Sequence, residues 1–281
     1  MANTGQAEYW NSRQGQNWVT FQSDLDLLLR GVTGQLIATA KPQPGSSIVD
    51  IGCGAGASTF EFARLIAPAG SIHGIDVSEP LIARARQRQQ ELAAGNVSFS
   101  IVDAQEEQLG SGNYDVGVSR FGVMFFSNPE KAFRNIARSV RSGGRIVFAA
   151  WAGAEHNPWF ALPQKAAIER LGPAEPSDPH APGPLAFSDA ERVLGILRNA
   201  GLASCHSAQV EIDLHHPGGL EPVLKIAPHV GPVARMLNVK SGTPEDLAAI
   251  LDSITRRFEI FLCDDGIRVP AVIHVFSAVV E

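Results

Sequence analysis

The fold is decided by the stretch IVDIGCGAG, which runs from Ile48 to Gly56. A buried-strand pattern leads into three alternate glycines, and an apolar helical pattern begins directly afterwards at Ala57. Because glycine has no Cβ atom, this turn lets a ligand lie against the backbone. The helix that follows offers N–H groups that have no partner within the helix. The stretch therefore predicts a ligand-binding turn at the edge of a sheet.

Strand and helix patterns alternate outward from this turn. Four alternations occur within about a hundred residues, which is typical of a parallel sheet in an α/β protein. Strands are predicted over residues 47–51, 71–76, 97–102, 115–119, 145–151, 205–214 and 271–280. Helices are predicted over 57–65, from the N-cap Ser78 to 94, from 128 to just before 142, and over 158–171.

Further helical patterns lie outside this alternation. One amphipathic helix is expected over 23–40, a capping box at Ser188 and Glu191 opens another, and Thr243 opens a third. Ligands of open α/β sheets bind beyond the carboxyl ends of the strands, so we expect these helices to form lids there. The predicted division is an N-terminal helical lid at 1–44, a cofactor-binding core at 45–151 and the rest of the core at 152–281, with helical insertions at 152–185 and 215–262.

Composition excludes several classes of protein. The 281 residues are 44% apolar and 19% charged, which indicates a packed globular chain and not a disordered one. A net charge of −6 gives no reason to expect nucleic acid as a partner. Three cysteines without CxxC spacing, and histidines without a ligand pattern, predict no metal. Without a signal peptide or an apolar run of about 18 residues, we expect a soluble, cytoplasmic protein with no membrane span.

Acidic residues stand at three predicted strand ends. Asp50 lies two residues before Gly52, where a carboxylate suits a cationic amino-acid group. Asp76 follows Gly56 by 76 − 56 = 20 residues and can accept bonds from both hydroxyls of a ribose, or simply stabilise a helix N-terminus. Asp103-Ala104 either contacts an adenine, through the carboxylate and the Ala104 N–H, or forms a turn.

Two other functions compete for the same turn. Gly52, Gly54 and Ala57 also satisfy the dinucleotide fingerprint, so an NAD-dependent oxidoreductase is an alternative. Asp50, Asp103 and the absence of a second nucleotide-binding unit favour a sulfonium nucleoside instead. A non-catalytic nucleoside-binding protein is a further alternative, and the complete set of acids and glycines argues only that binding is retained.

As a set, these motifs resemble class I S-adenosylmethionine-dependent methyltransferases, within the subgroup typified by ubiquinone/menaquinone-biosynthesis methyltransferases. The resemblance covers residues 45–151 and implies a Rossmann-like three-layer sandwich, with a seven-stranded, mostly parallel sheet whose last strand is antiparallel. The N-terminal segment is similar to the lid of bacterial small-molecule members. The motifs are Asp50-x-Gly52-x-Gly54-x-Gly56, Asp76, Asp103-Ala104, Tyr114–Ser119, Asn128–Phe133 and Ser142–Arg145, with Tyr9, Trp10 and Trp18 in the lid.

The resemblance also implies a cofactor and its contacts. S-adenosyl-L-methionine is the expected cofactor, and S-adenosyl-L-homocysteine the product. The turn would hold the methionine part, Asp76 and Val77 the ribose, and Asp103 with Ala104 the adenine. Ser119 and Arg120 would flank the sulfur that bears the methyl group. The full set of expected cofactor contacts is Trp18, Asp50, Gly52, Gly54, Gly56, Asp76, Val77, Asp103, Ala104, Ser119 and Arg120.

Methyl transfer to an O, N or C atom of a small molecule is therefore the predicted reaction. It is an in-line displacement with a neutral leaving group, so alignment matters most and no general acid is needed. Where a base is needed, His156 and Tyr9 are the candidates. Arg120 binds an acidic substrate group or pairs with Glu106 or Glu107. The acceptor pocket is expected at Tyr9, Phe121, Phe125 and Trp151, in a monomer or homodimer.

Overall fold

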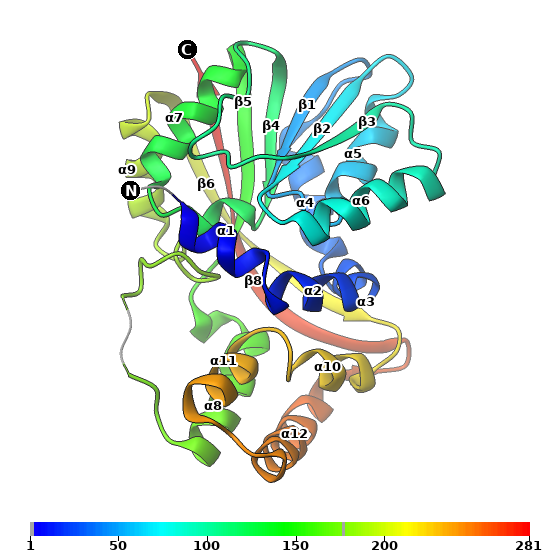
Figure 1. Cartoon of the computed structure of the whole chain (residues 1–281), viewed down its shortest axis with the longest axis vertical. Coiled ribbons are helices and arrows are strands. Elements are labelled where there is room, and N and C mark those ends of the chain that lie inside the picture. Colours follow the sequence, from blue (N-terminus) through cyan, green and yellow to red (C-terminus); the bar gives the residue numbers. More distant parts are fainter. Residues whose placement is uncertain (1–2, 176–177) are drawn as a thin grey trace.

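The computed structural model describes residues 3–175 and 178–281, and an eight-stranded sheet forms its centre (Figure 1). Seven strands follow the order β3-β2-β1-β4-β5-β8-β6, and β7 pairs with β8 beside this path. The strands are β1 (Ser47–Ile51), β2 (Ser71–Asp76), β3 (Val97–Ile101), β4 (Tyr114–Arg120), β5 (Val140–Trp151), β6 (Leu202–His216), β7 (Leu262–Cys263) and β8 (Gly266–Val280).

The direction of the strands confirms the predicted fold. Strands β1 to β5 pair in parallel, and β8 is antiparallel to both β5 and β6. The last strand, β8, is therefore antiparallel, as predicted. The sheet has one strand more than the seven that were predicted, and this additional strand is the two-residue β7. The chain progresses in opposite directions from β1, through β2 to one side and through β4 to the other. Such a switch point leaves a ligand-binding crevice at the carboxyl ends of the strands.

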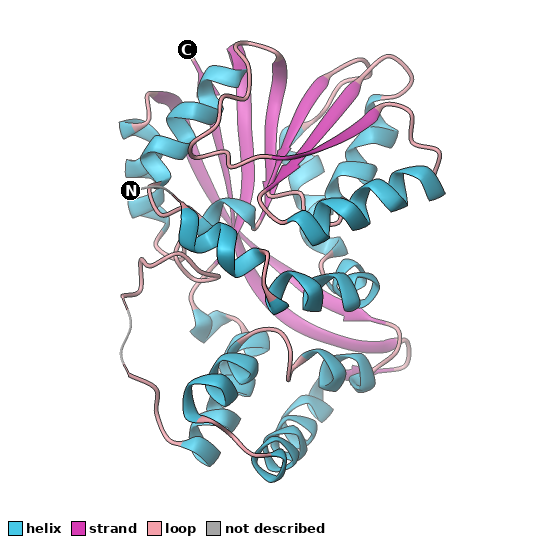
Figure 2. Ribbon diagram, in the orientation of Figure 1, coloured by secondary structure: helices cyan, strands magenta, loops and turns pink. Residues whose placement is uncertain are grey.

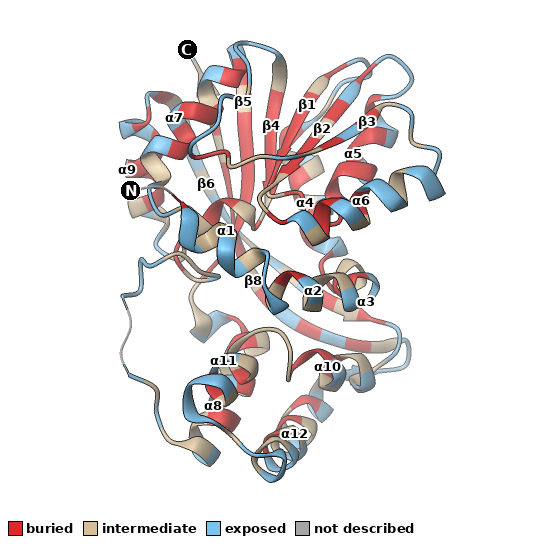
Figure 3. Cartoon of the chain, in the orientation of Figure 1, coloured by how far each residue is buried: buried red, intermediate tan, exposed pale blue. Residues whose placement is uncertain are grey.

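Helices cover both faces of the sheet (Figure 2). On one face α4 (Arg30–Ala40) packs against α5 (Ala57–Ile66), and α6 (Glu79–Glu91) lies against β2 and β3. On the other face α7 (Pro129–Ser139) packs against α9 (Ala190–Asn199). The apolar side chains between these layers form the core, which Figure 3 shows as buried along the middle of the sheet.

The remaining helices lie beyond the carboxyl ends of the strands. The N-terminal ones are α1 (Thr4–Trp10), α2 (Arg13–Thr20) and α3 (Gln22–Leu28). The later ones are α8 (Pro158–Leu171), α10 (Leu220–Ile226), α11 (Pro232–Lys240) and α12 (Pro244–Phe258). Helix α8 packs against α11 and α12, so the two predicted insertions meet in one group of helices, below the sheet in Figure 1. The division of the chain into three segments stays a prediction.

The long pairing of β6 and β8 connects α10, α11 and α12 to the sheet. Their antiparallel pairing runs from Leu202 opposite Val280 to His216 opposite Ile267. Strand β5 pairs with only part of β8, ending at Trp151 opposite Ile273. The rest of the β6–β8 ribbon extends beyond the core sheet. Helices α10, α11 and α12 lie between these two strands in the sequence. No helix in the described residues is long and apolar enough to cross a membrane.

Several local predictions were wrong at helix ends. The helix expected over 23–40 is divided at Leu29 into α3 and α4. Asp189 rather than Ser188 caps α9, because its carboxylate accepts a hydrogen bond from the Arg192 N–H. Ser78 precedes α6, but its hydroxyl donates to the Trp10 carbonyl instead of capping the helix. The capping pair of Thr243 and Asp246 forms at the start of α12.

Candidate active site

The glycine-rich turn joins the ends of β1, β2 and β4. The Gly52 and Cys53 N–H groups donate to the Ile75 carbonyl oxygen at 2.9 and 3.1 Å. Gly52 has a φ of +65°, and a Cβ atom there would lie 2.6 Å from the Gly122 Cα. A side chain would therefore separate the turn from the segment after β4. Gly54, by contrast, has open space where its Cβ would stand, on the side of a large cavity.

Asp76 supports this turn from the end of β2. One carboxylate oxygen accepts from the Gly54 N–H and the other from the Ser78 N–H, both at 2.9 Å. Burial raises the pKa of Asp76, and these two hydrogen bonds oppose the shift. Each carboxylate oxygen has a further lone pair, so Asp76 can still accept bonds from two vicinal hydroxyl groups.

Asp50 lies fully buried within β1. Its Oδ2 accepts from the hydroxyls of Ser58 and Thr59 at 2.8 and 2.7 Å, while its Oδ1 has no partner among the described residues. Burial raises the pKa of Asp50 to about 6. Buried carboxylate oxygens normally have a donor, because leaving one unpaired is costly. The chemistry of Oδ1 therefore fits a ligand, or a ligand-bound water, that donates an N–H or O–H.

A buried cation lies close to this carboxylate. The Arg120 guanidinium donates to Thr33 Oγ1 at 3.2 Å, and its Nη2 lies 3.7 Å from Asp26 Oδ1. Burial lowers the pKa of Arg120, and the negative charges of Asp26 and Asp50 oppose this shift. Arg120 therefore pairs with Asp26 of α3, whereas Glu106 pairs with Lys131. Together, Asp50 and Arg120 place one negative and one positive group near the turn.

Ser119, at the end of β4, has a structural role in this arrangement. Its hydroxyl donates to the Ile51 carbonyl at 2.7 Å and accepts from the Gly122 N–H at 3.2 Å. Ser119 is fully buried, so it fixes β4 to β1 beneath the crevice. A direct contact of Ser119 with a cofactor sulfur stays a prediction.

The N-terminal helices are fastened to the end of β2. Asn11 donates to the Val77 carbonyl at 2.9 Å and accepts from the Glu79 N–H at 2.8 Å. The Asn3 amide lies 3.4 Å from Asp103 Oδ1. Helices α1 and α2 therefore cover the strand ends where a ribose and an adenine are predicted to bind.

The strand ends and the helices beyond them enclose a cavity of about 2080 Å³. Sequence reasoning missed Gln14, Phe160 and Arg235, which also line it, because no motif marks their helices. Four predicted site residues are not among those that line the cavity: Asp50, Gly56, Asp103 and Ser119. The predicted residues that line the cavity are Tyr9, Trp18, Gly52, Gly54, Asp76, Val77, Ala104, Arg120, Phe121, Phe125, Trp151 and His156.

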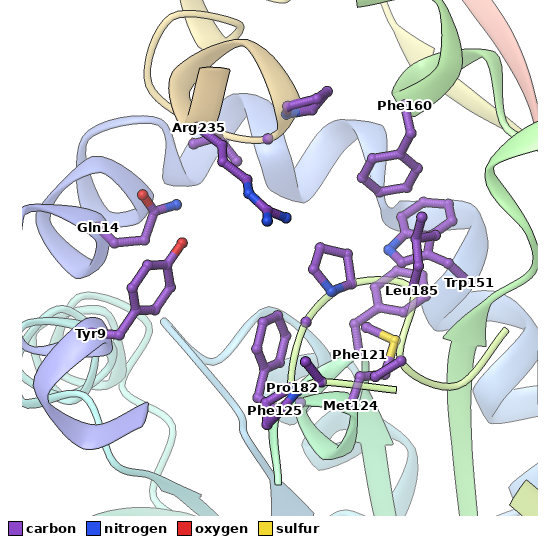
Figure 4. A pocket seen from close by; sticks show the side chains of 18 of the residues that line it. Tyr9, Gln14, Phe121, Met124, Phe125, Trp151, Phe160, Pro182, Leu185 and Arg235 are labelled. Atoms are coloured by element: carbon purple, nitrogen blue, oxygen red, sulfur yellow. The ribbon is translucent and has the colours of Figure 1, made fainter. Parts of the chain in front are cut away.

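The two candidate bases differ in their surroundings. His156 is half-exposed after β5, with its Nε2 3.6 Å from Glu155 Oε1. Tyr9 is half-exposed on α1, and desolvation raises its pKa although the charge of Arg235 opposes the shift. Its hydroxyl points toward Arg235 across the cavity (Figure 4). At neutral pH Tyr9 is therefore protonated and acts as a hydrogen-bond donor. Among the described residues, no group of metal-ligating side chains gathers.

Comparison with known families identifies the part of the chain that carries this turn. Residues 42–170 match a family model described as a methyltransferase domain. Residues 42–170 form a methyltransferase domain. The match confirms, for this part of the chain, the family predicted from the glycine-rich turn and the three acids. The methyltransferase domain thus includes β1 to β5 and nearly all of α8.

Curated relatives of this methyltransferase domain act on small molecules, according to their names. Aklanonic acid methyltransferase of Streptomyces sp. (strain C5) is 30% identical over 116 residues, which are 41% of this chain and 53% of that one. A ubiquinone/menaquinone biosynthesis C-methyltransferase of Ectopseudomonas mendocina is 30% identical over 106 residues, covering 37% and 41%. The chain spans about half the length of the curated relatives it matches.

Solved structures share the fold over most of this chain. The YcgJ protein of Bacillus subtilis has a TM-score of 0.55 at 18% identity, over 89% of this chain and 98% of that one. Phosphoethanolamine N-methyltransferase 2 of Haemonchus contortus, in complex with S-adenosyl-L-methionine, scores 0.54 at 16% identity, covering 88% and 51%. The [4+2]-cyclase SpnF scores 0.55 at 19%, covering 88% and 80%. A cyclase among these neighbours means that the fold by itself does not define the reaction.

Proposed function

We propose that this chain is an S-adenosylmethionine-dependent methyltransferase that methylates a small molecule. The observation that carries the proposal is the unpaired, buried Oδ1 of Asp50 beside Arg120 and beneath the glycine-rich turn. A carboxylate and a guanidinium together match the ammonium and carboxylate groups of a methionine moiety. The diphosphate of NAD would instead bring negative charge toward Asp50, so the dinucleotide alternative fits these residues poorly.

The cofactor contacts follow from the same strand ends. Gly54 would leave the backbone open to the methionine part, Gly52 lets the turn approach Gly122, and Asp76 with Val77 would hold the ribose. Asp103 and Ala104 would hold the adenine, and Trp18 would close the site from α2. When bound, S-adenosyl-L-methionine supplies an activated methyl group on a sulfonium, which leaves as a neutral thioether.

The residues of the chain then have two tasks. Helices α1, α2, α8 and α11 border the cavity and would exclude water and hold the acceptor in line, which accounts for much of the barrier reduction in such displacements. A base is required only for an acceptor that must lose a proton. His156 is our candidate for that base, whereas Tyr9 would donate a hydrogen bond.

The proposed partner is a small-molecule acceptor and not nucleic acid, since the net charge is −6. The cavity supports this choice, because it is enclosed by helices and mostly lined by apolar and aromatic side chains, as small-molecule sites are. We further propose a cytoplasmic monomer or homodimer.

Calorimetry with S-adenosyl-L-homocysteine and with NADH tests the proposal. We expect the homocysteine nucleoside to bind and NADH to show no binding. Asp76→Ala should weaken nucleoside binding at least about tenfold, because a bidentate contact to charge is lost. Asp252→Ala, on the exposed face of α12, is the control and should bind like the wild type. Binding of NADH alone would replace the methyltransferase by an oxidoreductase.

Transfer of a labelled methyl group from S-adenosyl-L-methionine to a panel of small acceptors tests turnover. Label in an acceptor establishes the reaction. Nucleoside binding with no transfer to any acceptor of the panel would favour the non-catalytic alternative.

A further inference from the structure

The cavity is larger than a cofactor alone requires. Its volume is about 2080 Å³, whereas single small-molecule sites are commonly about 300–1000 Å³. The cavity therefore has room for the cofactor and for a second ligand of comparable or larger size. The side chains around that second space define the chemistry of the ligand.

One side of the second space is aromatic. The rings of Phe121 and Trp151 are stacked, 4.3 Å apart with an angle of 10° between their planes, and Phe160 meets Trp151 edge-on at 5.1 Å. Phe121 adopts a left-handed conformation with φ of +68° directly after β4, and it precedes Gly122, which approaches Gly52 after β1 closely. Strained backbone of this kind is kept where the surroundings require it. Between 5% and 9% of each of these three aromatic residues is exposed, and this part gives the cavity an apolar, aromatic surface that suits an aromatic ligand.

The other side of the space is polar and carries a cation. Figure 4 shows Tyr9 of α1, Gln14 of α2 and Arg235 of α11 directed into the cavity. They lie on the opposite side from the aromatic wall. The Arg235 guanidinium forms no ion pair or hydrogen bond with any residue that the structure describes, whereas its backbone N–H donates to the Gly231 carbonyl within α11's first turn. Desolvation raises the pKa of Tyr9, although the positive charge of Arg235 opposes this shift, so the phenol stays protonated and can donate a hydrogen bond. The guanidinium of Arg235, the phenol of Tyr9 and the amide of Gln14 thus face the same part of the cavity, and none of the three is an anion.

The acidic residues that line the cavity belong to other segments and none forms an ion pair with Arg235: Asp76, Glu155, Glu175, Asp178, Asp189 and Glu191. Asp178 accepts from the His180 N–H, and Asp189 caps α9. Glu155 lies beside His156. The charge of Arg235 therefore remains available to a ligand.

From this arrangement we propose that the acceptor is a bulky, flat, largely apolar molecule that carries an anionic group, such as a carboxylate, and that Arg235 binds this anion with help from Tyr9. The proposal rests on the proposed methyltransferase function and specifies its acceptor. The aromatic wall lies at the ends of β4 and β5, beside the turn, so the methylated atom sits there. The anion lies on the opposite side and serves for recognition.

The test uses anthraquinone-2-carboxylate, its neutral carboxamide and benzoate as probes, titrated by calorimetry with and without S-adenosyl-L-homocysteine. We expect the carboxylate to bind at least about tenfold more tightly than the carboxamide, because a charge-assisted contact is added. Benzoate, which carries the anion but little apolar surface, should bind weakly. Arg235→Gln should abolish the preference for the carboxylate, and Arg235→Lys should keep part of it.

Arg256→Gln is the matched control, because Arg256 is an exposed arginine of the neighbouring α12 and does not line the cavity. Equal affinity for carboxylate and carboxamide, or a preference that survives Arg235→Gln, would overturn the proposal. Affinity for the homocysteine nucleoside is measured in the same samples. Nucleoside binding without carboxylate preference rejects the anion site alone, and carboxylate preference without nucleoside binding rejects the methyltransferase function alone.

Discussion

The side-chain amide of Asn17 donates a hydrogen bond to the backbone carbonyl oxygen of His229, over 3.0 Å. The Phe21 ring stacks on the His229 ring beside it, with centroids 5.2 Å apart. This contact joins α2 to the segment between α10 and α11. The N-terminal helices and the helices that follow β6 therefore touch at the border of the cavity, which both Asn17 and His229 line.

Loss of the Asn17 contact should make ligand exchange faster. We expect Asn17→Ala to raise the dissociation rate of S-adenosyl-L-homocysteine several-fold, because one hydrogen bond of about 1 kcal/mol no longer closes the cavity. Stopped-flow fluorescence of the nearby tryptophans measures this rate. Gln16→Ala, an exposed neighbour on α2, should leave it unchanged, and equal rates in both variants would contradict a closing role for Asn17.

Binding of the nucleoside should depend on pH through Asp50. Its pKa in the folded protein is about 6, above the usual 3.8. Below that pKa the carboxyl is neutral and attracts an ammonium group poorly, so affinity should rise as pH increases through about 6 and then level off. Calorimetry between about pH 5 and pH 8 measures the change, which is at most about tenfold per pH unit for one group.

The raised pKa of Asp50 also means that its burial costs stability at neutral pH when no ligand is bound. The folded state holds the Asp50 proton more tightly than the unfolded chain, so this contribution to stability decreases as pH rises from 3.8 to about 6. Asp50→Asn should flatten the pH dependence of binding and weaken binding at neutral pH. Asp252→Asn should leave both unchanged. An unaltered pH profile in Asp50→Asn would mean that another group titrates.

Gly122 and Gly34 differ in the space around them, so their substitution by alanine should have opposite effects. A Cβ on Gly122 would lie 2.7 Å from both the Gly52 Cα and the Ile51 carbonyl oxygen. Gly122→Ala should therefore displace the turn and abolish nucleoside binding. Gly34→Ala, in α4 with open space around it, should raise the stability by up to about 1 kcal/mol. Thermal unfolding with and without nucleoside distinguishes these outcomes.

Asn157 should matter for stability rather than for chemistry. Its buried side chain bonds both backbone groups of Val272 and the carbonyls of Ala152 and Gly153. Asn157→Ala leaves the partly buried Val272 N–H without this partner, and the free energy of unfolding should fall by about 1–3 kcal/mol. Urea unfolding measures the loss. Asn238→Ala, exposed on α11, should cost almost nothing, and equal stability of the two variants would contradict this account.

His156→Ala tests the candidate base. If the acceptor must lose a proton to His156, kcat should fall at least about 100-fold while affinity for S-adenosyl-L-homocysteine stays the same. Methyl-transfer assays on an acceptor found by screening measure kcat. Unchanged turnover would remove His156 as the base and favour an acceptor that reacts without one.

The sequence predicts best what local patterns determine. The bounds of β1, β2 and α8 agree with the predictions, because apolar runs there end at glycine or proline signals. Local pattern does not reveal contacts between distant segments. Asp26 as the partner of Arg120, and Arg235 in the cavity wall, depend on how α3 and α11 pack, and no motif marks them. Strand β6 is longer than predicted at both ends, because its pairing with β8, a contact between distant segments, extends from Leu202 to His216.

The position of β8 has a consequence for biosynthesis. This strand is made after β6 and yet lies between β5 and β6, and β6 pairs with no other strand of the described sheet. While the ribosome has translated only as far as α12, β6 has no neighbour, and the apolar edge of β5 is open. The nascent polypeptide must therefore wait for residues 266–280 before it can close its sheet, so folding is completed only after they emerge from the exit tunnel.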